Sequence, residues 1–427
     1  MNASSRSLWK HVDFRYLWAA QGVSQIGTQI SMLALPLIAA ISLDATAFEI
    51  GLLAAAGQAP AVIFGLVAGA WLDQRRRRPV MISADLGRAV LLSLIPVANY
   101  FNSLTIELLA IVAFAAGSLT IFFDIGYLSY VPSLIGRREL VRANSALEAT
   151  ASGAQVVGSG IGGGLVGLIG GPATMLVDVG SFLISALFIK RIAQPEPRPA
   201  VPEVRTRLTQ QITQGIQYVN TEPVLRTLLR VSMITNFFGF AFLAVYVLYL
   251  IRELDLSSTQ VGLVFAVGGV GALIGSLAAT PLQQRFGSGA TLIWSQFAFG
   301  ATGMLVPAAM LAPAIALPLV VGAEFLQWLA LLIYSINAIS LRQQRSSDVI
   351  QGRVHATFVF VARGLQPLGS VAGGVLGAVI GLPLTLVVGE LGMFGAFFLL
   401  LVSPVRNAVM TTGENAVPVV PALASVE

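Results

Sequence analysis

The sequence predicts an all-α membrane protein in which twelve transmembrane helices form two six-helix bundles related by a parallel repeat. Three observations lead to this prediction. Of the 427 residues, 56% are hydrophobic and only 11% are charged, whereas a soluble domain carries about 25% charged residues. The apolar residues form long continuous runs and do not alternate as they do in a β-barrel. The two halves of the chain also match each other at a fixed offset.

Twelve segments are long enough to span a bilayer, which requires about 20 mostly apolar residues. They cover residues 14–42, 47–71, 79–101, 104–130, 145–169, 172–192, 224–250, 258–281, 290–311, 314–341, 352–380 and 383–404. The first six belong to an N-terminal bundle (1–192) and the last six to a C-terminal bundle (223–406). The linker between them, 193–222, begins with prolines and charges and continues with glutamines, so we expect an amphipathic helix there. We expect the tail, 407–427, to be disordered.

Basic residues predict the orientation of the chain. Loops that follow even-numbered spans are rich in arginine, as in Arg75 to Arg78, and they include Arg142 and Arg353. Loops that follow odd-numbered spans contain one arginine, Arg252. Because positively charged loops stay in the cytoplasm, both termini and the linker are expected there. The net charge of +5 is explained by this distribution, so nucleic acid is not expected as a partner.

The chain repeats itself with an offset of 211 positions, which relates Arg15 to Arg226. The same offset aligns Gly51 with Gly262, Arg142 with Arg353, Gln155 with Gln366, Gly162-Gly163 with Gly373-Gly374, and Pro172 with Pro383. A bias toward apolar residues does not readily produce matched Arg, Gln and Pro in one register. Since each half has an even number of spans, both halves start on the same side and the repeat axis lies along the membrane normal. We therefore expect two bundles around a central cavity.

The loop between the second and third spans resembles the Gly-x-x-x-Asp-Arg-x-Gly-Arg-Arg signature of the major facilitator superfamily. The matching positions are Gly69, Asp73, Arg77 and Arg78, while Gln74 and Arg76 replace the usual Arg and Gly. The phrases Gln351-Gly352-Arg353-Val354 and Arg142-Ala143-Asn144-Ser145-Ala146-Leu147 resemble the exporter branch that includes macrolide-efflux and enterobactin-exporting proteins. The resemblance implies a monomeric secondary transporter of the bacterial inner membrane, which works by alternating access.

The same resemblance implies a conformational latch. Asp73, Arg77 and Asp124 would hold the two halves together in the outward-facing state and separate on opening; alternatively they are solvated loop charges. Asp85 and Arg88 are three residues apart on one face of the third span. We expect them to form a local ion pair, with a supporting role in the latch.

Several charged residues lie within the predicted spans, where an ionisable group suggests a functional site. Glu324 lies near the middle of the tenth span, and desolvation of a buried carboxyl makes protonation easier, so we expect it to couple transport to protons or to recognise a cation. Arg363 lies at a similar depth, and a purely structural Glu324–Arg363 pair is an equal alternative. Asp178 and Glu390 are either proton sites open to the outside or solvated interfacial acids.

Polar side chains within the spans predict the lining of a substrate cavity. Gln21, Gln25 and Gln29 share one face of the first span because they are four residues apart. The resemblance implies that spans one, four, seven and ten line the cavity. The other expected lining residues are Asn236, Phe237, Gln327, Trp328, Tyr334, Asn337 and Gln366. Such a mixture of amides and aromatics suits an amphipathic ligand, although interhelical hydrogen bonding, worth about 0.6 kcal/mol each, is the alternative.

These observations predict a transporter and not an enzyme: a proton-coupled exporter of hydrophobic or amphipathic small molecules such as drugs. Two alternatives remain, an exporter of a defined metabolite such as a siderophore or of a lipid, and a non-transporting membrane sensor or scaffold. No cofactor is expected. No metal site is expected either, because cysteine is absent and the two histidines, His11 and His355, are isolated in the sequence.

Overall fold

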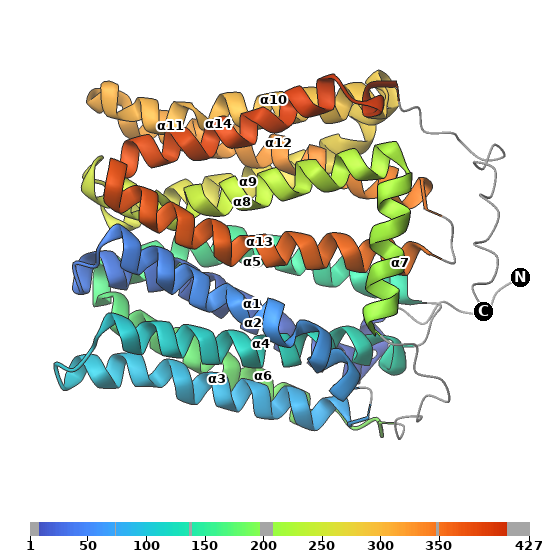
Figure 1. Ribbon diagram of the computed structural model, residues 1–427. Helices are drawn as coiled ribbons and strands as arrows, with labels where there is room; N and C mark the ends of the chain where they lie inside the picture. Colours follow the sequence, from blue (N-terminus) through green and yellow to red (C-terminus); the bar gives the residue numbers. More distant parts are fainter. Residues whose placement is uncertain (1–7, 73, 136–138, 197–207, 347–349, 408–427) are drawn as a thin grey trace, which may run out of the picture.

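The computed structural model describes residues 8–72, 74–135, 139–196, 208–346 and 350–407, and it is all-helical there (Figure 1). Twelve helices in this part of the chain are long and apolar enough to cross a membrane. They are α1 (Val12–Leu37, continued by the π-helical η2, Ile38–Ser42), α2 (Ala47–Leu72), α3 (Arg77–Tyr100), α4 (Ile106–Ile135), α5 (Leu140–Ile169), α6 (Gly171–Arg191), α8 (Pro223–Arg252), α9 (Ser258–Phe286), α10 (Ser288–Gly303, continued by α11, Leu305–Ala308, and η4, Ala309–Leu311), α12 (Ala316–Gln344), α13 (Gln351–Ile380) and α14 (Leu382–Leu401). The predicted fold class is confirmed.

Some helices are longer than the apolar segments that predicted them. α5 starts at Leu140, five residues before the predicted span, and α12 ends at Gln344. The backbone hydrogen bonds of a helix continue beyond the hydrocarbon region, whereas hydropathy marks only the part that lies within it.

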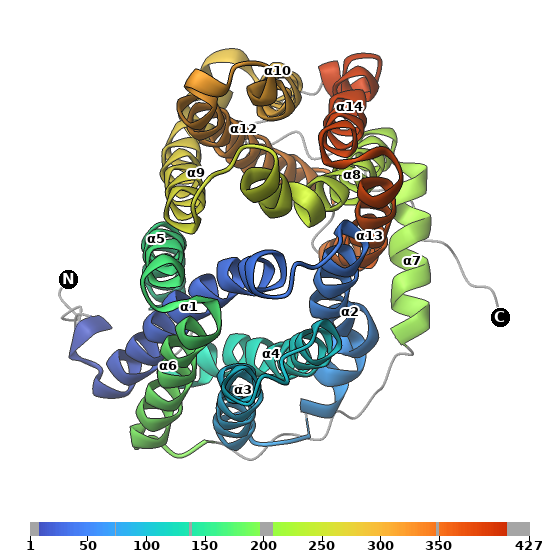
Figure 2. The ribbon, with the colours of Figure 1, turned by 90° about the vertical axis from the view of Figure 1, so that its left-hand side faces the viewer.

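The twelve helices form two bundles, α1–α6 and α8–α14, and the repeat is visible in their packing. In the first bundle α1 packs on α5 and α6, as α8 packs on α13 and α14 in the second. Between the bundles, α2 packs against α13 and α5 packs against α9 (Figure 2). Because α9 is the repeat equivalent of α2 and α13 that of α5, these two interfaces are equivalent by the pseudo-two-fold axis.

The repeat extends to the caps of two helices. At the start of α2, the Thr46 N–H donates to Glu49 Oε2 (2.7 Å) and the Glu49 N–H donates to Thr46 Oγ1 (3.3 Å). At the start of α9, Ser257 and Gln260 form the same reciprocal pair, with distances of 2.8 and 3.3 Å. Both pairs are capping boxes, which satisfy the free N–H groups of the first turn, and they are 211 positions apart.

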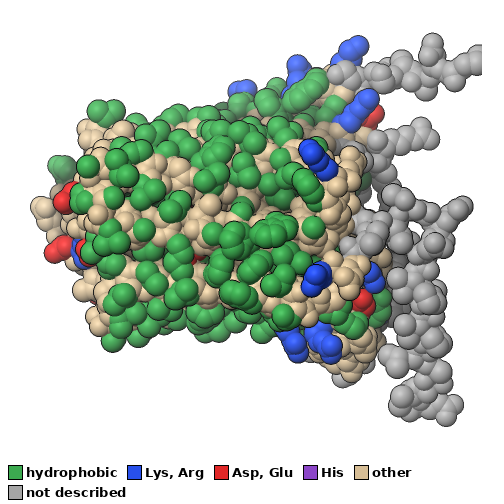
Figure 3. All heavy atoms as spheres, turned by 90° about the horizontal axis from the view of Figure 1, so that it is seen from above, with side chains coloured by type: hydrophobic (Ala, Val, Ile, Leu, Met, Phe, Trp, Pro, Cys, Tyr) green, Lys and Arg blue, Asp and Glu red, His purple; other side chains and the backbone are tan. Residues whose placement is uncertain are grey.

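On the face shown in Figure 3, charged side chains lie mainly at the two ends and leave a hydrophobic region between them. Lys and Arg gather at one end, which we call the basic end (Figure 3). This end also carries α7 (Leu208–Thr221), which lies across the second bundle (Figure 1). The opposite end, which we call the far end, carries the loops between α1 and α2 and between α8 and α9. A hydrophobic belt is typical of a protein that spans a membrane. The excess of positive charge at one end follows the positive-inside rule.

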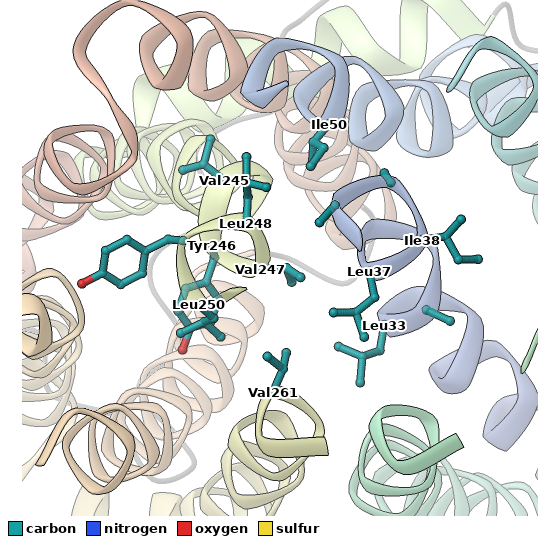
Figure 4. Close-up of a cluster of buried hydrophobic side chains, with 14 of the residues drawn as sticks. Leu33, Leu37, Ile38, Ile50, Val245, Tyr246, Val247, Leu248, Leu250 and Val261 are labelled. Atoms are coloured by element: carbon teal, nitrogen blue, oxygen red, sulfur yellow. The ribbon is translucent and has the colours of Figure 1, made fainter. Parts of the chain in front are cut away.

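Within the described residues, the hydrophobic core that the two bundles share lies at the far end. One cluster of buried residues there contains Leu33 and Leu37 of α1 together with Val247 of α8 and Val261 of α9 (Figure 4). At the basic end, in contrast, one cluster belongs to the first bundle and another to the second. The described part of the chain is therefore closed at the far end, while its cores are separate at the basic end.

Close glycine contacts and an ion pair complete the closure of the far end. A Cβ on Gly51 would lie 2.7 Å from the Gly374 Cα, and a Cβ on Gly163 would lie 2.6 Å from the Gly262 Cα. These two pairs are repeat equivalents. Across the same end, Arg252 Nη2 lies 2.5 Å from Asp44 Oδ1, so the single arginine of the odd-numbered loops joins the two halves.

A side chain at Gly51 is expected to open the far end. In Gly51→Ala the added carbon would meet backbone atoms of α13, which cannot rotate away, and overpacking of this kind costs about 1–3 kcal/mol. A change of this size shifts a two-state equilibrium by roughly 5- to 150-fold. The measurement is the alkylation rate of a cysteine introduced by Val247→Cys. The natural chain has no cysteine, so this thiol is the only one present. Val247 is 5% exposed in the closed far end, so the thiol should react slowly until that end opens.

Gly57→Ala is the matched control, since it lies on the same helix and its added Cβ would meet nothing within 4 Å. We expect faster alkylation in Gly51→Ala and an unchanged rate in Gly57→Ala. Equal rates in the two variants would contradict the closure described here.

Candidate functional site

Glu324, on α12, is buried in the second bundle at 3% exposure. It accepts hydrogen bonds from Tyr246 Oη (2.7 Å) and from Trp328 Nε1 (2.8 Å). Tyr246 comes from α8 and is itself part of the hydrophobic cluster that closes the far end. The Glu324 carboxyl is therefore linked by one hydrogen bond to the contact between the bundles.

A second buried carboxyl, Glu390 on α14, lies in the same region. Its Oε1 accepts a hydrogen bond from Gln327 Nε2 (2.7 Å), and its Oε2 has no hydrogen-bond partner among the described residues. It is close enough to Glu324 to interact with it electrostatically. Glu390 is 0% exposed, so it is not a solvated acid. The sequence did not predict that the two carboxyls lie together.

No Lys or Arg in the described part of the chain forms an ion pair with either carboxyl. The alternative of a Glu324–Arg363 pair is therefore wrong in this conformation. Arg363 and Asp124, a residue of α4 in the first bundle, are both exposed and form no ion pair with each other. The charge at Asp124 is influenced first by Arg88 and then by Arg363. Asp124 and Arg363 thus place opposite charges on the two bundles in the half of the molecule nearer the basic end.

The first bundle contains its own buried charge cluster. Arg88 of α3 forms the predicted ion pair with Asp85, and its guanidinium lies 4.5 Å from the ring centroid of Phe123 and 4.1 Å from that of Phe182. Cation–π contacts of this kind are strongest where water is absent. Asp178 lies close enough to interact with Arg88. The cluster is sealed inside the bundle, so Arg88 and Asp85 do not bridge the two halves.

Asp178, on α6, is 1% exposed, so the interpretation as a solvated acid is wrong. It accepts hydrogen bonds from Ser31 Oγ (2.5 Å) and from Ser181 Oγ (2.7 Å). These hydroxyls come from α1 and from its own helix, and Gly27 lies against the same group. The acid is therefore tied to α1, which carries part of the far-end closure.

The predicted latch is only partly visible. Asp73 lies outside the described residues. Arg77 lies at the start of α3, where Glu196 accepts hydrogen bonds from the N–H groups of Arg77 (2.6 Å) and Arg78 (3.1 Å) and lies 3.8 Å from the Arg77 side chain. Glu196 therefore caps the start of α3. The sequence did not predict this role for Glu196. Arg77 forms no ion pair with Asp124 in this conformation.

The predicted cavity residues divide into two groups. Gln327, Tyr334 and Asn337 are buried inside the second bundle, at 3–9% exposure, and Gln21 is buried in the first at 8%, so in this conformation they offer little surface to a cavity. Gln327 binds Glu390, and Asn337 Nδ2 donates to the Ile333 carbonyl at 2.8 Å. The half-exposed group consists of Gln25, Gln29, Asn236, Phe237, Trp328 and Gln366.

Comparison with known proteins agrees with this architecture. A family model described as the Major Facilitator Superfamily matches residues 17–362. The chain is 28% identical over 369 residues to the multidrug efflux pump Tap of Mycolicibacterium fortuitum, an alignment that covers 84% of this chain and 88% of that protein.

The fold also matches a bacterial homologue of the iron transporter ferroportin in two states. The TM-score is 0.75 for the inward-facing form, at 15% identity and with 93% of this chain and 99% of that chain covered. It is 0.61 for the outward-facing form, at 16% identity and with 91% and 98% covered. Together with the family model and the twelve-helix fold, these findings show that the chain belongs to the major facilitator superfamily, a family of membrane transporters.

Proposed function

We propose that this transporter exports hydrophobic or amphipathic small molecules such as drugs, and that inward proton flow drives it. The observation that carries the proposal is the pair of buried carboxyls, Glu324 and Glu390, for which no basic partner is present among the described residues. Two carboxylates that interact electrostatically away from water repel each other, so a proton on one of them relieves an electrostatic cost. This pair is therefore suited to binding and releasing a proton.

The contacts of Glu324 suggest how proton binding is coupled to the conformation. The Glu324 carboxylate holds Tyr246, which packs in the far-end closure. A proton on Glu324 weakens its charge-assisted hydrogen bonds to Tyr246 and Trp328. The proton would thereby favour a change at the contact between the bundles, as alternating access requires.

The substrate class and direction rest on separate support. The relative Tap is named a multidrug efflux pump, and the half-exposed Gln25, Gln29, Asn236 and Phe237 combine amide and aromatic groups suited to amphipathic ligands. By the positive-inside rule the basic end faces the cytoplasm, so the closed far end would face the outside of the cell. We assign the protein to the bacterial inner membrane as a monomer.

A transport assay in proteoliposomes tests the proposal. The purified chain is reconstituted with a pH-sensitive dye inside, and a fluorescent amphipathic cation such as ethidium is supplied as substrate. We expect substrate movement against its gradient when a pH gradient is imposed, together with proton flux in the opposite direction. Movement that continues unchanged after the pH gradient and the membrane potential are collapsed would disprove proton coupling, and movement restricted to one compound would indicate a defined metabolite.

A further inference from the structure

A crevice opens on the outer perimeter of the first bundle, near the basic end. Its lining residues come from the short helix η1 (Leu8–Lys10), the start of α1 and the last turns of α6. Figure 2 shows α1 and α6 side by side in the first bundle. The volume of the crevice is about 330 Å³, and its lining residues are Trp9, Val12, Arg15, Tyr16, Trp18, Ala19 and Phe188. The proposed transport pathway uses none of these residues.

The walls of the crevice are aromatic and held in place. Trp9 packs edge-on against Trp18, with ring centroids 5.0 Å apart, and Tyr16 stacks on Phe188 at 6.2 Å. Trp18 Nε1 donates a hydrogen bond to Thr150 Oγ1 on α5 (2.8 Å). The crevice is therefore preformed, which lowers the entropy cost of binding a flexible chain.

Among the lining residues of this crevice, the charged one is Arg15. Arg15 is exposed, and no carboxylate in the described part of the chain forms an ion pair with it. The acid nearest to it in sequence, Asp13, instead accepts hydrogen bonds from the N–H groups of Ala193 and Gln194, both at 2.9 Å. The guanidinium of Arg15 is free to bind an anion, and it disfavours a cationic ligand.

The internal repeat shows that this crevice is peculiar to the first bundle. Arg226 is the repeat equivalent of Arg15 and is also exposed. The aromatic residues have no aromatic counterparts: the positions equivalent to Trp9, Tyr16, Trp18 and Phe188 are Asn220, Thr227, Leu229 and Leu399. A general need for a basic residue at this depth explains both arginines, but it does not explain the aromatic walls.

We propose that this crevice binds an anionic phospholipid from the leaflet at the basic end, with its phosphate on Arg15 and an acyl chain along the aromatic walls. A guanidinium matches the geometry of a phosphate through paired hydrogen bonds. Aromatic side chains with one apolar and one polar edge favour the depth of the lipid headgroups. The free cation next to an apolar groove thus matches both parts of an anionic lipid.

Native mass spectrometry of the full chain tests the proposal, with phosphatidylglycerol and phosphatidylcholine of the same acyl chains added in equal amounts. We expect wild type to retain one phosphatidylglycerol in preference to phosphatidylcholine, and Arg15→Gln to lose this preference by about tenfold, equivalent to about 1.4 kcal/mol. Trp9→Leu is expected to weaken retention of both lipids. Arg226→Gln, which removes the same charge from the equivalent position, should behave like wild type.

Further controls keep the result interpretable. Size-exclusion chromatography and the helical circular dichroism signal identify any variant that fails to fold, and Arg15→Lys, which keeps the charge but loses the paired donors, is expected to be intermediate. Excess inorganic phosphate should not displace the lipid, because it cannot fill the aromatic groove. Equal retention of the two lipids by wild type, or equal losses in Arg15→Gln and Arg226→Gln, would overturn the proposal.

Discussion

Replacement of Arg88 by methionine is expected to lower the free energy of unfolding by about 3–5 kcal/mol, which is the usual cost of removing one partner from a buried ion pair. Arg88 is 3% exposed, and Asp85 and Asp178 are 0% and 1% exposed. Without the guanidinium, both carboxyls would lie in the bundle with no neighbouring cation. Methionine keeps most of the apolar volume between Phe123 and Phe182. The loss of stability therefore measures the missing charge and not a cavity left by a smaller side chain.

Reversible unfolding in mixed detergent micelles measures this effect. Arg142→Met is the control: its side chain is 64% exposed and lies 3.6 Å from Glu139, and an exposed pair of this kind contributes at most about 1 kcal/mol. Adding Asp85→Asn and Asp178→Asn to Arg88→Met should restore much of the lost stability, because no buried charge then remains unpaired. If Arg88→Met and Arg142→Met lose equal stability, the cluster does not have the role assigned to it.

The second large effect is expected at the carboxyl pair of the second bundle. Glu324→Gln should reduce proton-driven uphill transport at least about tenfold, corresponding to 1.4 kcal/mol or more. Glutamine has nearly the shape of glutamate and its carbonyl can still accept a hydrogen bond from Tyr246 or Trp328. It cannot exchange a proton, so the coupled step should fail while the fold is retained.

The assay for this variant separates coupling from binding. Downhill exchange of labelled for unlabelled substrate does not require a proton gradient, and we expect Glu324→Gln to retain it. Glu390→Gln should also impair uphill transport, whereas Glu107→Gln, an exposed acid at the far end, should not. Undiminished uphill transport in both Glu324→Gln and Glu390→Gln would remove the basis for assigning proton coupling to this pair.

The local features of the chain were predictable because they depend on neighbouring residues. The twelve spans follow from continuous apolar runs, and the segregation of Arg and Lys to one end follows from the loops in which they occur. The Asp85–Arg88 pair follows from helical periodicity, since residues three apart share a face. The offset of 211 predicted that the two bundles would be equivalent, and the matched contacts Gly51–Gly374 and Gly163–Gly262 show this equivalence in space.

Only the tertiary structure decided which side chains meet across helices. Glu324 binds Tyr246, 78 positions away, and not Arg363, and Asp178 binds Ser31, 147 positions away. Periodicity shows that such residues lie on a helix, but it does not give the rotation of that helix or the neighbour that its face meets. The sequence therefore determined the spans, the charged end and the family, whereas the packing of the helices decided which acids are buried together.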